Sequence, residues 1–196
     1  MATNLNIDAM GSSTTNRTRI VLLCNAEHGQ ANIPLAIAHE LLIRDNIEVH
    51  LCSFPNLRER FDDQLRKHGE AYGAHLVERA YFHDLKGPTV TEVFLRSAKR
   101  GPFHAAGFRG CIQGLSNVFE DYWGWEETEY VDTYTSCRKV LENVDPDLIV
   151  VDYFFLPGRD VVQNQNRKYC LMNTTSISHI VLGLQSHQAY LWKYPM

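Results

Sequence analysis

The chain has 196 residues, a formal net charge of −4 and a composition that is 44% hydrophobic. A chain of this length is typical of one globular domain with its own core. Its pI of about 6.1 argues against a nucleic-acid-binding protein, which needs a clustered basic surface. No apolar run approaches the roughly 18 residues of a membrane helix, so we expect no transmembrane segment.

Residues 1–18 are rich in Asn, Ser and Thr and lack the apolar core of a signal peptide, so we expect a flexible tail. The five cysteines are odd in number and include no C-x-x-C pair. Cys24, Cys52 and Cys170 fall in or beside predicted strands, which favours buried free thiols in a reducing compartment. We therefore expect a cytoplasmic protein.

The first chemical signal is the loop that follows a strand near the N-terminus. Residues 20–24 are a short apolar run, as in a strand buried on both faces of a parallel sheet. The polar loop after such a strand lies at the carboxyl edge of an open α/β sheet, where ligands bind. We therefore expect the chemistry of this chain to lie near Glu27, His28 and Gln30.

A helix is predicted directly after this loop. Ile33, Ile37 and Leu41 recur at helical spacing, which predicts that they form its apolar face. Pro34 falls in the first turn, where a helix tolerates proline.

The remaining elements alternate in type along the chain. Further strands are predicted at residues 47–54, 74–80, 148–152 and 168–173, and further helices at residues 57–68, 89–95, 126–143 and 156–166. Thr89 is the predicted N-cap of its helix. Strands that alternate with helices in this way indicate parallel βαβ units, hence a Rossmann-like α/β fold with helices flanking the sheet. No second domain is visible.

Several common catalytic and cofactor motifs are absent. Gly29 is followed by Gln-Ala-Asn, so the G-x-G-x-x-G fingerprint of nicotinamide and flavin proteins is missing. The sequence also has no P-loop and no G-x-S-x-G elbow. The histidines and cysteines show no zinc-ligand spacing, so we expect no metal site.

Two stretches resemble the family 1 glycosyltransferases, most closely their fungal members. Residues 19–44 resemble the opening strand, His- and Gly-containing loop and long helix of that family. Residues 146–160, PDLIVVDYFFLPGRD, resemble its later strand that ends in an aspartate before an apolar helix. The resemblance covers most of residues 19–184. It implies that residues 19–196 are the N-terminal, acceptor-binding lobe of a two-lobed GT-B protein, and that the donor-binding C-terminal lobe is absent from this chain.

The resemblance also implies a reaction. Such enzymes transfer a hexose, with inversion, from a UDP-sugar to a small lipophilic hydroxyl acceptor. The sugar nucleotide is a substrate held mainly by the missing lobe, and no cofactor is implied. A loop histidine removes the proton from the acceptor, because a hydroxyl is a poor nucleophile until it is deprotonated. An aspartate holds that histidine, and Asp152 matches this aspartate.

The histidine of the family does not match directly. The family loop commonly reads Gly-His, whereas this chain reads Gly29-Gln30, and an amide is not a base at neutral pH. His28 is therefore the candidate base, with a solvated loop histidine as the alternative interpretation. Gly29 and Gln30 are expected to line the acceptor site.

An aromatic block supplies the candidate acceptor pocket. Tyr122, Trp123 and Trp125 are the residues expected to line it, and helical core packing is the alternative for them. Other functions stay open at this point: a catalytically silent module that binds a small molecule or a partner, one chain of a split transferase whose donor-binding lobe is another polypeptide, or an unrelated flavodoxin-like domain.

Overall fold

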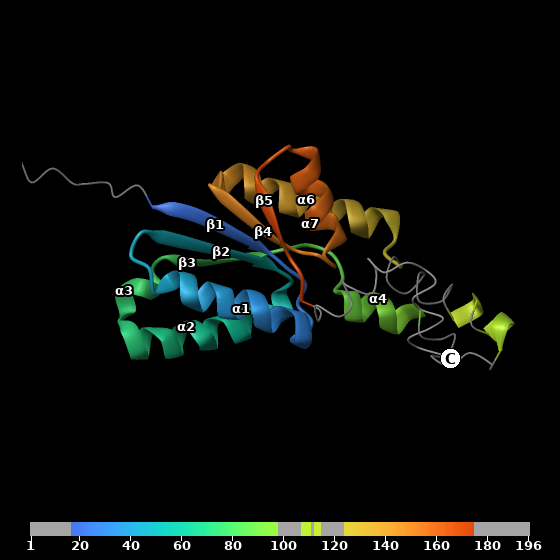
Figure 1. Ribbon diagram of the computed structural model, residues 1–196, viewed down its shortest axis with the longest axis horizontal. Coiled ribbons are helices and arrows are strands. Elements are labelled where there is room, and N and C mark those ends of the chain that lie inside the picture. Colours follow the sequence, from blue (N-terminus) through green and yellow to red (C-terminus); the bar gives the residue numbers. More distant parts are fainter. Residues whose placement is uncertain (1–16, 98–106, 111, 115–123, 175–196) are drawn as a thin grey trace, which may run out of the picture.

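The computed structural model describes residues 17–97, 107–110, 112–114 and 124–174. Within these ranges, five strands form one sheet in the order β3-β2-β1-β4-β5, and every pairing is parallel (Figure 1). The strands are β1 (Thr18–Leu23), β2 (Ile47–Ser53), β3 (Ala80–Asp84), β4 (Leu148–Asp152) and β5 (Tyr169–Met172). The predicted Rossmann-like α/β fold is confirmed.

Helices cover both faces of this sheet. They are α1 (His28–Leu42), α2 (Arg58–Tyr72), α3 (Ala74–Val77), α4 (Val90–Ser97), α6 (Glu127–Val144) and α7 (Leu156–Asn164), with a short 3₁₀ turn at Pro55–Leu57. In Figure 1, α1 and α2 lie on one side of the sheet and α6 and α7 on the other. The sheet is therefore the middle layer of three, and its long apolar runs are buried from both sides.

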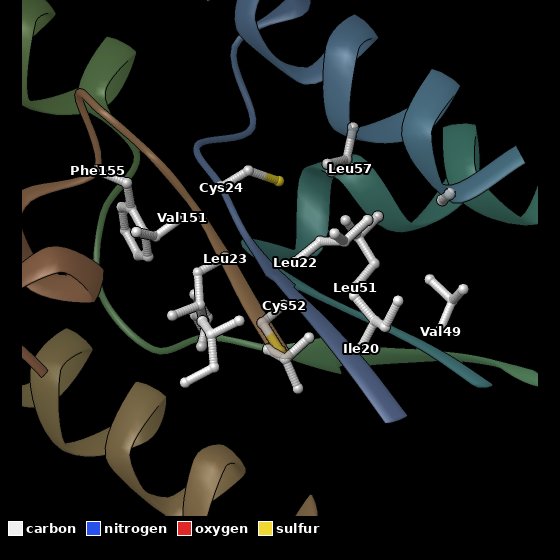
Figure 2. Packing of buried hydrophobic residues seen from close by; sticks show 14 of the residues in the cluster. Ile20, Leu22, Leu23, Cys24, Val49, Leu51, Cys52, Leu57, Val151 and Phe155 are labelled. Atoms are coloured by element: carbon white, nitrogen blue, oxygen red, sulfur yellow. The ribbon is translucent and has the colours of Figure 1, made fainter. Parts of the chain in front are cut away.

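The core follows from the alternation of side chains along β1 and β2. Figure 2 shows Leu22 and Leu51 on the side of α1 and α2, whereas Leu23 and Cys52 lie on the opposite side of the sheet. All four side chains are fully buried.

The cysteine prediction is correct in part. Cys24, Cys52 and Cys137 are buried free thiols, but Cys170 is exposed. The reason is that β5 is an edge strand of the described sheet, so only one long side of it is paired.

The face of α1 that packs on the sheet differs from the predicted one. Ile33 is 36% exposed, and Ile37 and Leu41 are only half-buried. The fully buried positions of α1 instead include Ala31 and Ala38. Leu35 and Leu42 are buried on the same face, so the stripe that packs on the sheet is rotated relative to the predicted one and combines small and large side chains.

The third strand begins later than predicted. Residues 74–80 were expected to be extended, but residues 74–77 form the single turn α3, and β3 starts at Ala80. The pairing of Val49 with Ala80 sets this start, and so does the hydrogen bond from the Val49 N–H to the Arg79 carbonyl, 2.8 Å. Because β3 is a half-exposed edge strand, it lacks the continuous apolar run that marks β1.

Gly87 occupies a position that only glycine fits, in the turn that precedes α4. Its φ is +105°, and an added Cβ would lie 2.3 Å from the Thr133 hydroxyl oxygen. That hydroxyl donates a hydrogen bond to the Lys86 carbonyl, 2.8 Å. We expect Gly87→Ala to lower the free energy of unfolding by about 1–3 kcal/mol in urea titrations. Gly29→Ala is the control, since no atom would lie within 4 Å of its Cβ; equal stability of the two variants would contradict the prediction.

Candidate active site

The site is built where β1 and β4 end side by side. These strands pair in parallel, with Leu23 opposite Val151, so the loop after β1 starts beside Asp152. A hydrogen bond from the Ser53 hydroxyl to the Cys24 carbonyl, 2.9 Å, ties the end of β2 to the same loop. The topology therefore gathers the polar residues that follow these strands at the carboxyl edge of the sheet.

Asp152 is a buried carboxyl group with an incomplete set of hydrogen bonds. Its side chain is 0% exposed, and its Oδ1 accepts the Phe154 backbone N–H at 3.1 Å. Its Oδ2 has no hydrogen-bond partner in the described part of the chain. Burial raises the pKa of Asp152 to about 6; the backbone N–H groups of Phe154 and Asn25 oppose this shift, and the charge of Glu27 adds to it. A carboxyl group of this kind exchanges protons near neutral pH.

The loop itself is held by side-chain contacts at both ends. Asn25 is fully buried, and its side-chain amide donates a hydrogen bond to the Gln30 Oε1 at 3.1 Å. Glu27 precedes α1, and its Oε1 accepts the Thr91 backbone N–H at 2.8 Å. The second carboxylate oxygen of Glu27 is buried and has no hydrogen-bond partner among the described residues. Two carboxylate oxygens at this edge thus lack a donor.

The two candidate catalytic residues lie at neighbouring strand ends but are not paired. His28 is the first residue of α1 and is exposed, as is Gly29. Within the described ranges, no hydrogen bond joins His28 to Asp152. Gln30 is half-buried and is drawn towards Asn25. The roles of His28 as base and Asp152 as its partner stay predictions.

Of the three aromatic residues predicted to line the acceptor pocket, one can be placed. Tyr122 and Trp123 lie outside the described residues. Trp125 is half-buried, and its indole N–H donates to the Pro88 carbonyl at 3.2 Å. Trp125 therefore supports the turn that leads into α4.

Sequence reasoning missed two contributors to this edge, Asn25 and Thr91. Asn25 was visible as a polar residue directly after a buried strand, which is a usable signal, and Glu27 was named with this loop but given no role. Thr91 had no such signal, because its contact with Glu27 spans 64 positions. Only the folded chain brings the start of α4 to this loop.

Other features do not mark a competing site. A shallow groove of about 540 Å³ lies between α1 and α2, lined by residues such as Leu35, His39 and Gln64, and it does not include the strand ends. In the described residues, no group of three or more His, Cys, Asp or Glu side chains could hold a metal ion. None of the described helices has the length and apolar character needed to cross a membrane.

The sequence is similar to those of known glycosyltransferases. No family model matches the sequence. The chain is 24% identical over 185 residues to the glycosyltransferase sdnJ of Sordaria araneosa, covering 91% of this chain and 36% of that protein. It is 30% identical over 145 residues to erythritol-mannosyl-transferase 1 of Pseudozyma antarctica, covering 68% of this chain and 21% of that protein. The chain thus spans about a third or less of the length of these curated relatives.

A solved structure shows the same fold. The SsfS6 glycosyltransferase of Streptomyces sp. SF2575 superposes with a TM-score of 0.51 at 15% identity, over 80% of this chain and 39% of that chain. Sequence relatives and fold together define the class of protein, a glycosyltransferase with a Rossmann-like lobe. The sequence relatives are glycosyltransferases and the fold is that of a GT-B glycosyltransferase, in agreement with the resemblance to family 1 seen in the sequence.

Proposed function

We propose that this chain is the N-terminal, acceptor-binding lobe of an inverting UDP-glycosyltransferase that transfers a hexose to a small lipophilic hydroxyl acceptor. The observation that carries the proposal is the adjacency of β1 and β4, which sets the loop of His28 beside the buried carboxyl group of Asp152. The named relatives support sugar transfer to a hydroxyl group, since one is a glycosyltransferase and another is an erythritol-mannosyl-transferase. Erythritol is a polar polyol, so the lipophilic character of the acceptor rests on the family resemblance alone.

The residues at this edge suit proton transfer from a hydroxyl group. In the proposed reaction, the His28 imidazole takes the acceptor proton, and Asp152 stabilises the resulting positive charge. The acceptor oxygen then bonds to the anomeric carbon, and the bond from that carbon to the diphosphate breaks with its electron pair. Because His28 is exposed in the first turn of α1, it must turn inwards to reach Asp152. The unpaired Oδ2 of Asp152 is an acceptor available to it.

The donor sugar nucleotide requires a second lobe. We propose that this lobe is supplied by the remainder of a longer polypeptide or by a separate chain. The buried free thiols of Cys24, Cys52 and Cys137 support a reducing, cytoplasmic compartment. The polypeptide purified from its native cells should therefore have a mass well above 22.5 kDa, or a single co-purifying partner. It should transfer hexose from a UDP-sugar to apolar alcohols.

The choice of base can be tested in that complete enzyme. His28→Ala should lower kcat/KM by about 10²-fold or more, because a positioned general base contributes at least that much. Gln30→Ala is the matched control from the same loop, and we expect it to change kcat/KM by less than about tenfold, since an amide removes no proton. Equal, small effects of both substitutions would contradict the assignment of His28.

One observation favours a second candidate function, a catalytically silent binding module. The loop reads Gly29-Gln30, and His28 has no hydrogen bond to Asp152 in the described structure. This alternative predicts a native mass of 22.5 kDa and no hexose transfer with any UDP-sugar.

A further inference from the structure

Two histidines of neighbouring strands form a pair that has no part in the candidate active site. His50 lies in β2 and His83 in β3, and the His50 Nδ1 is 2.9 Å from the His83 Nε2. Parallel pairing places Cys52 opposite His83, and Cys52 lies on the side of the sheet opposite α1 and α2 (Figure 2). Because side chains alternate along a strand, His50 and His83 both lie on that side of the sheet.

A carboxylate holds the second ring nitrogen of His50. The Glu48 Oε1 lies 2.8 Å from the His50 Nε2. An ionised carboxylate only accepts hydrogen bonds, so His50 carries its proton on Nε2 and has a lone pair on Nδ1. His83 then donates its Nε2 proton to that lone pair. A histidine that binds a metal ion usually donates its outer N–H to a carboxylate in the same way, so Glu48 already holds His50 as a ligand would be held.

The separation of the two facing nitrogens is close to that of two ligands of one metal ion. Zn–N bonds of about 2.0–2.1 Å at a tetrahedral angle set the two nitrogens about 3.3 Å apart. The observed 2.9 Å is shorter by a few tenths of an ångström, which a rotation about the soft last torsion of each histidine can supply. When His83 carries its proton on Nδ1 instead of Nε2, both lone pairs face the ion and no net proton is lost.

The pair is accessible from solvent on one side. His50 is buried, whereas His83 is only half-buried. The ring of Tyr81 stacks on His50, with the ring centroids 4.8 Å apart, and Tyr81 is 42% exposed. An ion can therefore reach the pair past Tyr81 and His83 without any change in the strands.

The charges around the pair favour a cation. Arg19 and Arg58 act on the two histidines, but Arg19 is paired with Asp145 at 4.0 Å and Arg58 with Asp84 at 2.5 Å. The Glu48 carboxylate is the charge in direct contact with the pair. These five groups together carry one negative charge, which attracts a positive ion.

We propose that His50 and His83 are the two protein ligands of a site for a divalent late transition-metal ion such as Zn²⁺ or Cu²⁺. Glu48 orients His50, and water completes the coordination; imidazole suits these ions. The site has two protein ligands, so it differs from the groups of three or more that the described residues lack. Ligand spacing along the chain did not signal it, because the two histidines are 33 positions apart and meet only through the pairing of β2 with β3. The site does not depend on the proposed sugar transfer.

The test is a titration of the ¹⁵N-labelled chain with Zn²⁺, followed by NMR of the imidazole nitrogens. The His50 Nδ1 and His83 Nε2 signals should shift. Cu²⁺ should displace Zn²⁺ and Mg²⁺ should not, because imidazole nitrogen prefers the late transition metals. Glu48→Gln should weaken Zn²⁺ binding about tenfold, and His83→Ala by at least about that much, since even an outer carboxylate contributes this factor.

The pair of His39 and His68 provides the matched control. Its Nδ1 atoms are also 2.9 Å apart, but His68 is buried and its Nε2 has no hydrogen-bond partner in the part of the chain that the structure describes. His39→Ala should therefore leave the Zn²⁺ affinity unchanged. The shifts in the wild type locate the ion even if a variant fails to fold. No shift in excess Zn²⁺, shifts at His39 and His68 instead, or equal Zn²⁺ affinity of His83→Ala and the wild type would overturn the proposal.

Discussion

Arg79→Met is expected to lower the free energy of unfolding by about 3 kcal/mol, because it removes a buried, charged donor that binds three backbone carbonyl groups. The Arg79 side chain is 2% exposed. Its guanidinium group donates hydrogen bonds to the carbonyls of Leu42, Arg44 and Ile47, at 2.9, 2.5 and 3.0 Å. These carbonyls lie at the last residue of α1, in the connection to β2 and at the first residue of β2. The dipole of α1 also favours a positive charge near its C-terminus.

The measurement is urea denaturation of the wild type and the variant, with the midpoint and the slope compared. Arg66→Met is the matched control, since Arg66 makes two ion pairs, with Asp63 and Glu70, but is exposed. We expect no resolvable loss in the control, because solvent screens exposed ion pairs. If the two variants lost equal stability, the capping role of Arg79 would be wrong.

Asp152→Asn is expected to gain stability relative to the wild type as the pH rises from acid to neutral. Burial raises the pKa of Asp152 to about 6, whereas an unfolded aspartate titrates near 4. The native state therefore binds the proton more tightly, and the wild type loses stability as pH rises from about 4 to about 6. A shift of roughly two pKa units corresponds to a loss of about 3 kcal/mol in the free energy of unfolding of the wild type. This loss is complete only above about pH 6.

Urea titrations of Asp152→Asn and of the wild type, at about pH 4 and at about pH 7, test this linkage. Between pH 4 and pH 7, the difference in unfolding free energy between the two proteins should change by up to about 3 kcal/mol in favour of the variant. Titrating groups other than Asp152 cancel in this comparison, apart from those coupled to it, such as Glu27. If the difference in unfolding free energy did not depend on pH, burial would not raise the pKa of Asp152 in the native state. A carboxyl group that costs stability at neutral pH is what a functional site would retain.

Local pattern was enough to predict the elements that are buried on both faces or are capped locally. The apolar runs of β1 and β4 admit few interpretations, because only a central strand of a parallel sheet buries every side chain of a short segment. Thr89, as the expected N-cap, predicted the start of α4, and in the structure it pairs with Glu92 within one turn. A parallel sheet places the loops after β1 and β4 at the same edge, and the structure shows that these two strands are neighbours.

Tertiary contacts decided the rest, for reasons that local pattern cannot encode. Spacing alone gave α1 an apolar face, but the face that packs on the sheet is the one with Ala31, Leu35 and Ala38, because α1 has apolar residues on more than one stripe and only tertiary packing selects between them. The third strand begins at Ala80 because of its pairing with β2. The contact of Glu27 with Thr91 joins residues 64 positions apart, so it exists only after folding. The sequence by itself therefore determined the class of fold and the edge that carries the candidate site. The three-dimensional structure decided which side chains meet there, because hydrogen bonds and packing between distant segments depend on the folded positions of both partners.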